Sequence, residues 1–435
     1  MMRLLIALLT VTFTSFAMAH GSARSGPTPE RHIHFPDTAN YQTLVLDLHT
    51  HSVFSDGHVW PTIRVSEALR DGLDGLAITE HLEFQPHISD IPHPDRNRAY
   101  EEALRTAEGH PLKVIPGVEI TRSDEPGHIN AVFVKDANPL VKKRQADEPL
   151  PSAEYETREE AVAFTIERGP LFHGAHSIER DGKTIWRPYP DPATYLAIMN
   201  YGLAVTFDPR EVLQAANDQG AFVFWNHPSF ATVDAELNKF HRAAIKDGLL
   251  HGVEIANGDH YYPNAHRLAM KHDLALIGVS DVHELIEWDY QPEAAHNPGH
   301  RPVTLVLAEG DSLEAMRAAL FAGRSVVWWK DKLIGRKAHV DALLAASLAI
   351  ESVEPSTWGI VVRVRNASDA PFQLRQRGDA KITSQASTLT IAPNQVTEIS
   401  MKVDDKEAPI KLEFDVLNAL IAPNKAAQIT LSFGS

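Results

Sequence analysis

Two short segments rich in aspartate and histidine directly follow apolar runs of the chain. Residues 47–52 read Asp-Leu-His-Thr-His-Ser, and residues 280–283 read Ser-Asp-Val-His. In an extended strand, residues i and i+2 face the same side, so each segment directs two ligand-capable side chains one way. This spacing is suited to binding a metal ion. The four residues concerned are His49, His51, Asp281 and His283.

Further ligand-capable residues stand at the ends of other apolar runs. They are Asp56, Glu80, His81, Glu119, His128 and His227, with Asn226, Glu254 and Asn257 at comparable positions. The chain has no cysteine, so a metal must be held by His, Asp and Glu. A single histidine is weak evidence for a ligand, but the joint pattern predicts a multinuclear site. Imidazoles suit zinc, iron or manganese, and a carboxylate can bridge two cations.

The composition is that of a globular protein. A chain of 435 residues with 43% hydrophobic and 23% charged residues can form two domains, or one large barrel with an appendix. A disordered or fibrous chain is excluded. The formal net charge of −16 argues against a nucleic-acid groove, which needs a basic surface. A small substrate is expected, and no nucleic acid.

Residues 1–19 have the pattern of a secretory signal peptide. A short basic region precedes an apolar run over residues 4–16, and Ala17-Met18-Ala19 is a small-x-small cleavage box. The apolar run is shorter than the roughly 20 residues that cross a bilayer. We expect cleavage, export to the periplasm or the medium, and no membrane attachment afterwards. Residues 20–42 are expected to form an exposed leader, with His32 and His34 exposed rather than metal-bound.

From residue 43, apolar strands alternate with helical patterns. Strands are expected at 44–47, 75–79, 113–120, 129–134, 203–207, 221–225, 252–256, 274–279 and 303–308. Helices are expected at 62–70, 96–106, 210–217, 235–246, 263–271 and 312–321. The alternation predicts an α/β fold with a mainly parallel sheet, closed into a barrel that carries its strand ends at one mouth. The candidate ligands lie at those ends.

Two parts of the chain depart from this alternation. The barrel domain is expected over 43–335, and a polar, Pro-containing stretch at about 140–200 predicts an insertion near its mouth. A helix over 342–350 then leads into short strands without intervening helices, which predicts a small all-β sandwich over 345–435. That region contains no histidine, so we expect it to supply no metal ligand and to have an accessory role. Its strands are expected at 359–364, 372–375, 388–391, 397–403, 410–416 and 428–433.

Taken in order, the motifs resemble those of the polymerase and histidinol phosphatase (PHP) superfamily of metal-dependent phosphoesterases. The resemblance covers roughly residues 43–330. It implies a distorted seven-stranded β/α barrel with three metal ions at its mouth, and hydrolysis of phosphoesters. The motifs are Asp47-Leu-His-Thr-His-Ser, Ser55-Asp-Gly, Ile78-Thr-Glu-His, Gly117-Val-Glu-Ile, Asn226-His-Pro and Ser280-Asp-Val-His.

The resemblance also implies a ligand set for each of three divalent ions. These sets are His49, His51, Glu119 and Asp281 for the first ion, the shared Glu119 with His128 and His227 for the second, and Asp56, His81 and His283 for the third. The family often has Asp at the position of Glu80, which is not carried over as a ligand. His173 or His176 could replace His128, and His58 could replace Asp56. Zinc, manganese and iron are not distinguished.

Such a cluster would hydrolyse a phosphoester without a protein nucleophile. Adjacent cations lower the pKa of a bridging water, supply hydroxide for in-line attack and neutralise the phosphoryl oxygens. Catalytic roles fall to Glu119, Asp281 and His283, and either His283 or a bound water could protonate the leaving alkoxide. Arg122 is a candidate phosphate clamp, and His87 could line the substrate pocket. The chain has no Gly-rich phosphate loop, nucleophile elbow or cysteine nucleophile.

The interpretation is an exported metal-dependent phosphoesterase acting on a small phosphorylated substrate. Two other functions remain open. A barrel that binds metal or a partner without turnover is opposed by its complete set of nine ligands. Hydrolysis of a carbon–nitrogen bond is opposed by the absence of a barrel lysine for a carbamylated bridge and by Glu119 in its motif. The sequence gives no oligomeric state.

Overall fold

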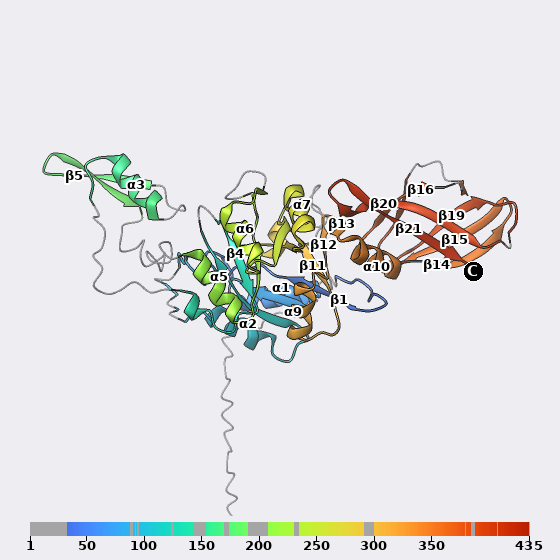
Figure 1. The fold of residues 1–435 in the computed structure, drawn as a ribbon, viewed down its shortest axis with the longest axis horizontal. Coiled ribbons are helices and arrows are strands. Elements are labelled where there is room, and N and C mark those ends of the chain that lie inside the picture. Colours follow the sequence, from blue (N-terminus) through green and yellow to red (C-terminus); the bar gives the residue numbers. More distant parts are fainter. Residues whose placement is uncertain are drawn as a thin grey trace, which may run out of the picture.

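An α/β barrel is followed by an all-β domain, and Figure 1 shows the two side by side along the long axis. The computed structural model describes residues 33–434 except 88–89, 92, 94, 123–125, 142–153, 169–173, 190–207, 230–234, 291–299, 379, 384–387 and 407. The expected fold class is confirmed. The predicted signal peptide and the predicted strand at 203–207 lie outside the described residues.

The barrel wall follows the strand order β10-β8-β7-β4-β3-β2-β1. Neighbouring strands are parallel except around β4, which runs antiparallel to both β3 and β7. Several of these strands are buried along their whole length, as expected where both faces of a sheet are covered. Their bounds are β1 Gln42–Asp47, β2 Gly75–Ile78, β3 Lys113–Ile120, β4 Ile129–Val132, β7 Phe222–Trp225, β8 Gly252–Asn257 and β10 Ala275–Val279, with the short β9 His260–Tyr261 paired to β8.

The two ends of this wall, β1 and β10, meet through the loops that follow them. Thr50 forms a parallel bridge with Val282. The backbone N–H of Asp281 donates to the carbonyl oxygen of His49 at 3.0 Å. The barrel is therefore joined at the two Asp/His-rich segments.

Helices α1, α2, α5, α6, α7, α8 and α9 accompany the barrel strands. Proline at the first helical position begins α1, α5 and α7, where its missing N–H leaves no bond unmade. Helix α6 begins at Lys239 rather than at residue 235, because the Asn238 side chain accepts a backbone N–H and caps it there. The bounds are α1 Pro61–Asp71, α2 Arg98–Ala107, α5 Pro209–Asp218, α6 Lys239–Lys246, α7 Pro263–His272, α8 Ile286–Asp289 and α9 Leu313–Phe321.

The sheet of the barrel continues into the C-terminal domain. Strands β11 (Val303–Ala308), β12 (Ser325–Trp329) and β13 (Lys332–Gly335) follow β1 in antiparallel pairs. Strand β13 then pairs in parallel with β20 (Ile410–Ala422). Backbone hydrogen bonds therefore connect the two domains directly.

The C-terminal domain is the expected all-β sandwich. Its first sheet has the order β14-β15-β19-β17, and β18, β16, β20 and β21 form the second. The predicted helix over 342–350 is misplaced, because α10 (Lys337–Ser347) ends earlier and β14 begins at Leu348, where it pairs with β15. The remaining bounds are β14 Leu348–Ser356, β15 Gly359–Asn366, β16 Phe372–Arg377, β17 Lys381–Ile382, β18 Thr388–Ile391, β19 Val396–Lys402 and β21 Lys425–Phe433.

The segment before β1 differs from the expected exposed leader in its described part. Ile33 and Phe35 are buried, and the Phe35 ring meets the Trp328 ring edge-on with centroids 5.1 Å apart. Burial of these two apolar side chains ties residues 33–41 to the barrel, whereas His34 between them is exposed. Among the described helices, none has the length and apolar character needed to cross a membrane.

The stretch predicted as an insertion has its own secondary structure where it is described. It follows η1 (Asn138–Leu140) and contains α3 (Arg158–Arg168) and the hairpin of β5 (Gly174–Arg180) and β6 (Lys183–Tyr189). Figure 1 shows α3 and β5 set apart from the barrel strands. The expectation that this unit lies near the mouth therefore receives no support from its described part.

Below the mouth, a buried arginine joins two carboxylates. The guanidinium of Arg301 contacts Asp47 at 3.1 Å and Asp71 at 2.8 Å, and all three side chains are inaccessible to solvent or nearly so. Asp47 also accepts from the backbone N–H and the hydroxyl of Ser280. The network links the end of β1 and the segment after β10, which carry the two Asp/His motifs, to the end of α1.

Replacing Arg301 by leucine is expected to lower the free energy of unfolding by about 3–5 kcal/mol, because it leaves two buried carboxylates without a counter-charge. Urea denaturation followed by tryptophan fluorescence measures the effect. Arg363→Leu, which removes an exposed guanidinium paired with Glu398, serves as the control and should leave the midpoint unchanged. Equal midpoints for Arg301→Leu and the unmodified protein would show that this network does not stabilise the barrel.

Candidate metal centre

The nine residues implied as ligands lie together at the carboxyl-terminal mouth of the barrel. The antiparallel β4 brings its amino end to this mouth, which is why His128, just before β4, joins residues that follow parallel strands. In chain order, His49, His51 and Asp56 lie in the loop after β1, His81 follows β2, Glu119 lies in β3, His128 precedes β4, His227 follows β7, and Asp281 and His283 follow β10.

Glu119 is at the centre of this group. Its carboxylate is completely buried, and its two oxygens face different imidazoles. A carboxylate with rings on both sides is suited to bridging two cations. Oε1 lies 2.9 Å from His128 Nδ1, 3.5 Å from His227 Nε2 and 3.6 Å from His49 Nε2, and Oε2 lies 2.5 Å from His81 Nδ1 and 3.5 Å from His51 Nε2.

Asp281 faces the same two histidines of the first motif. Its Oδ1 lies 3.1 Å from His49 Nε2 and 3.2 Å from His51 Nε2. These two ring nitrogens are themselves 3.0 Å apart. Two imidazole nitrogens and one carboxylate oxygen thus point at a common position, which is a suitable arrangement for one ion.

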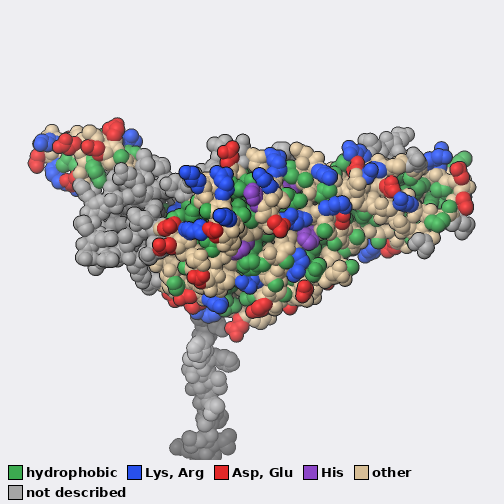
Figure 2. Space-filling view, viewed as in Figure 1, with side chains coloured by type: hydrophobic (Ala, Val, Ile, Leu, Met, Phe, Trp, Pro, Cys, Tyr) green, Lys and Arg blue, Asp and Glu red, His purple; other side chains and the backbone are tan. Residues whose placement is uncertain are grey.

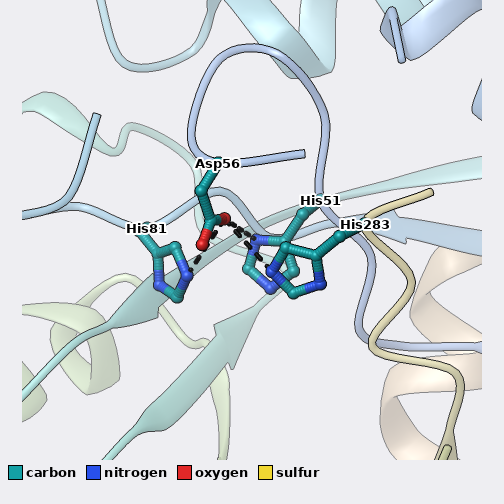
Figure 3. A group of neighbouring side chains, drawn as sticks. All are labelled: His51, Asp56, His81 and His283. Atoms are coloured by element: carbon teal, nitrogen blue, oxygen red, sulfur yellow. Dashed lines mark ion pairs between the residues drawn. The ribbon is translucent and has the colours of Figure 1, made fainter. Parts of the chain in front are cut away.

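Asp56 collects a second set of rings on the outer side of the cluster (Figure 3). Its Oδ1 lies 3.1 Å from His283 Nε2 and 3.3 Å from His81 Nε2, with His51 Nδ1 at 4.0 Å. Figure 3 shows the rings of His81, His51 and His283 directed toward this carboxylate from three segments of the chain.

The arrangement fits divalent cations. Buried carboxylate oxygens of Asp56, Glu119 and Asp281 lack a hydrogen-bond donor although imidazole nitrogens surround them. Within the described residues, the ligand atoms form three overlapping groups: His51, Asp56, His81 and His283; His49, His51 and Asp281; and His81, Glu119 and His128. In the third group His81 stands where the family pattern places His227. Imidazole and carboxylate donors of this kind bind zinc, manganese or iron.

The charge states of His51 and Glu119 agree with a ligand role. Burial, together with the neighbouring imidazoles of His283 and His81, lowers the pKa of His51 to about 3, so this ring is neutral, which is the form that binds metal. Burial alone would raise the pKa of Glu119, but the imidazoles of His81 and His128 hold it well below the usual range. The carboxylate therefore stays ionised.

Two of the ligand-capable residues have left-handed backbone conformations. Asp281 has φ 53° and His227 has φ 22°. Residues other than glycine adopt positive φ at a cost of order 1–3 kcal/mol, and such residues cluster at functional sites. The strain is offset by hydrogen bonds of the surrounding backbone, including that from the N–H of Asp281 to His49 and that from the N–H of His227 to Glu254 at 2.6 Å.

Two buried groups next to the cluster hold its loops without acting as ligands. Glu80 accepts hydrogen bonds from the hydroxyls of Ser52 and Ser55, so its carboxylate faces away from the cluster, as expected for a residue not assigned to a metal. Arg64 donates from Nε to the His51 carbonyl at 2.8 Å and from NH2 to the Val282 carbonyl at 3.3 Å. It therefore fixes the two Asp/His segments relative to each other.

A cavity of about 440 Å³ opens onto the cluster. Three residues that the sequence did not single out line it, and no spacing or composition signal distinguishes them. They are Ser229, His260 and Tyr262, beside Asp56, His81, Glu119, His128, His227, Asp281 and His283.

Arg122 and His87 are not among the described residues that line this cavity, so their roles in phosphate and substrate binding stay predictions without support from the cavity. The Arg122 side chain is buried and paired with the carboxylate of Glu83, and its NH1 also donates to the Thr121 carbonyl at 2.9 Å. His87 lies in the loop after Phe84, with its ring 6.3 Å from that of His58. The acidic partner of Arg122 lies 39 positions away in the sequence, so no local pattern revealed the pair.

The alternative ligands are not brought to the cluster where they are described. The His58 ring is exposed and pairs with Glu284, so Asp56 rather than His58 faces the imidazoles. His173 and the side chain of His176 lie outside the described residues.

Comparisons with known proteins place two families on the chain. The PHP domain matches residues 47–175, and an Ig-like domain matches residues 348–432. The crystal structure of a two-domain protein of Bacteroides vulgatus, described as containing a predicted PHP-like metal-dependent phosphoesterase, is similar over 92% of this chain and 98% of its own. The two are 30% identical, with a TM-score of 0.71.

Curated relatives cover a smaller part of the chain. A probable phosphatase of Caldanaerobacter subterraneus is 27% identical over 193 residues, which is 43% of this chain and 65% of that protein. A probable phosphatase of Thermoanaerobacter sp. strain X514 is 25% identical over 193 residues, or 43% of this chain and 67% of that protein. The chain thus matches about two thirds of the length of these relatives.

The buried carboxylate of Glu254 forms hydrogen bonds that position several of the candidate ligands. His49 Nδ1 donates to its Oε1 at 2.8 Å, which directs His49 Nε2 toward Asp281. Its Oε2 accepts from the His227 N–H at 2.6 Å and from Asn257 Nδ2 at 2.8 Å, and that amide also donates to Asp281 at 3.1 Å. A charged residue inside an apolar strand was the only sequence signal for this role.

Glu254→Gln is expected to weaken metal binding about 10–100-fold, because the amide offers one acceptor oxygen where two are used and because partners of ligating histidines contribute this much. Competition with a chelating dye measures the affinity. Glu83→Gln is the control, since Glu83 is a buried carboxylate at the same mouth that bonds Thr121 and Arg122 instead. Unchanged metal affinity in Glu254→Gln would exclude the orienting role.

Proposed function

The chain belongs to the PHP family of metal-dependent phosphoesterases, and we propose that it hydrolyses a phosphoester bond of a small phosphorylated substrate at this mouth. The observation that carries the proposal is the convergence of six imidazoles and three carboxylates in one cluster, of which four imidazoles and all three carboxylates line an open cavity. A barrel that had lost its activity would not be expected to keep this set together beside an accessible cavity.

We propose three divalent ions, zinc, manganese or iron, held as the family pattern implies. His49, His51, Glu119 and Asp281 would hold the first, Glu119, His128 and His227 the second, and Asp56, His81 and His283 the third. When bound, such ions activate water for attack on phosphorus and neutralise the phosphoryl charge. Asp281 Oδ1 and Glu119 Oε2 face the cluster without a hydrogen-bond donor, which supports their use as ligands.

His283 is disposed as a ligand rather than as a proton donor. Its Nδ1 donates to the Asp281 carbonyl at 2.9 Å, so Nε2, 3.1 Å from Asp56, is the ring nitrogen that would bind an ion. A hydrogen bond of this kind fixes the tautomer and ring orientation of a metal-binding histidine. Protonation of the leaving alkoxide is therefore assigned to water.

The charge of the cavity favours a small substrate over a nucleic-acid strand. None of the described residues that line it is lysine or arginine, so the phosphoryl charge would be balanced by the ions. On the face drawn in Figure 2, lysine and arginine are interspersed with aspartate and glutamate. Strand-tracking enzymes instead use a continuous basic groove.

Glu119→Ala tests the activity. In the mature protein supplied with zinc, manganese or iron, release of p-nitrophenol from p-nitrophenyl phosphate or bis-p-nitrophenyl phosphate should fall more than about 100-fold, because even partners of the ligands contribute 10–100-fold. The variant should also hold fewer ions. Glu108→Ala, at an exposed position after α2, is the control and should match the unmodified protein.

The ratio of monoester to diester turnover would define the substrate class. A protein that binds the ions but cleaves neither ester would contradict the proposed function and favour a binding role or carbon–nitrogen hydrolysis.

We also infer export, which rests on the signal-peptide pattern of residues 1–19. Expression with the full N-terminus in a bacterial host should give periplasmic or secreted protein whose first residue is His20. N-terminal sequencing of the fractionated protein measures this. Leu8→Arg, which interrupts the apolar run, should retain the uncleaved chain in the cytoplasm. An unmodified protein that keeps Met1 inside the cell would contradict export.

A further inference from the structure

We propose that the catalytic cavity binds substrates with a planar aromatic group through the rings of His260 and Tyr262. The inference rests on the proposed phosphoesterase function and names the class of group attached to the phosphate. Both residues line the cavity that contains Asp281 and His283. Neither belongs to any of the candidate ligand groups.

Strand pairing places the two rings on one face of a hairpin. Strand β9 pairs antiparallel with β8, with Asn257 opposite His260 and Ala256 opposite Tyr261. Tyr262 directly follows β9, and its N–H donates to the Ile255 carbonyl at 2.9 Å. His260 and Tyr262 both line the cavity, whereas the Tyr261 hydroxyl lies against His266. The rings of His260 and Tyr262 are nearly parallel, with an angle of 12° between their planes and centroids 6.4 Å apart.

This separation leaves aromatic surface available to a ligand. Atoms in direct contact lie about 3.5–4.0 Å apart, so two nearly parallel rings with centroids at 6.4 Å do not cover each other's faces. A flat group can stack on such rings, and stacking of this kind tolerates different ring systems because each has a π face.

The hairpin that carries the rings is fixed to the barrel. The indole N–H of Trp329 donates to the Gly258 carbonyl at 2.9 Å, and the Gly258 N–H donates to the Val279 carbonyl at 3.1 Å. On the opposite face, the Tyr261 hydroxyl lies 2.8 Å from His266 Nδ1. A surface held in place before binding loses little freedom when a ligand arrives, so its contacts add directly to affinity.

The charges of the residues that line the cavity also indicate which kind of substrate group the two rings can bind. Its described lining contains the carboxylates of Asp56, Glu119 and Asp281 and no lysine or arginine. A second phosphate or carboxylate on the substrate would find no cationic side chain among those residues. The described lining therefore favours an uncharged group at the two rings, with the substrate charge on the phosphate that is cleaved.

Benzyl phosphate and cyclohexylmethyl phosphate provide a matched pair of substrates. Both release a primary alcohol of similar reactivity and size, but only the benzyl ring is flat. The metal-loaded protein should show a kcat/KM for benzyl phosphate about 10-fold higher, because stacking on one or two rings contributes on this order. If only diesters are cleaved, the methyl diesters of the same alcohols replace them.

Variants separate the rings from the other polar groups of the cavity. Tyr262→Leu and His260→Ala should each reduce the benzyl preference, and the double variant should abolish it. Tyr262→Phe keeps the ring and loses the hydroxyl, so it should retain the preference. A preference that is lost equally in Tyr262→Phe, or that is absent from the unmodified protein, would overturn the inference.

A binding measurement distinguishes failure of this inference from failure of the proposed function. Benzylphosphonate and cyclohexylmethylphosphonate, which are not hydrolysed, are titrated calorimetrically into the metal-loaded protein. Tighter binding of benzylphosphonate, reduced in Tyr262→Leu, supports the aromatic site even if no ester is cleaved. Equal affinities with active hydrolysis would contradict the aromatic site while leaving the phosphoesterase function intact.

Discussion

The carboxylate of Glu119 is the group on which the rest of the site depends. It is buried, ionised and within 3.6 Å of five imidazoles. Burying a charge is costly unless other groups compensate for it. None of the five imidazoles that surround the Glu119 carboxylate lies in β3 itself. The rings arrive from β1, β2, β4 and β7, so the barrel has to close before the charge is balanced, and the mouth is where the fold brings these strand ends together.

The structure meets this requirement with a second layer of polar groups. Glu254 orients His49 and holds the backbone of His227, Glu80 holds the loop after His51 through two serines, and Arg64 bonds the carbonyls of both Asp/His segments. Deeper still, Arg301 pairs with Asp47 and Asp71. These groups fix the ring orientations and allow Asp281 and His227 to keep left-handed backbone angles. The geometry of the mouth thus depends on residues that do not line the cavity.

Much of this could be predicted from the sequence, for physical reasons. The two-residue spacing of His49 and His51 and the position of Glu119 at a strand end follow from strand geometry, and apolar runs located most of the barrel strands. The sequence did not reveal contacts between residues that lie far apart in the chain. The capture of Arg122 by Glu83, the burial of Phe35 against Trp328 and the start of β14 at Leu348 all depend on partners distant in the chain. Tyr262 carries no motif, and only the pairing of β9 with β8 brings it to the cavity.

The central claim is that Glu119 bridges ions in a multinuclear centre, and anomalous diffraction from crystals of the metal-reconstituted protein tests it most directly. Data collected on both sides of the metal absorption edge locate each ion. The account predicts several anomalous peaks at the mouth, with Glu119 between two of them and Asp56 at another. A single peak, or peaks away from the Glu119 carboxylate, would contradict it.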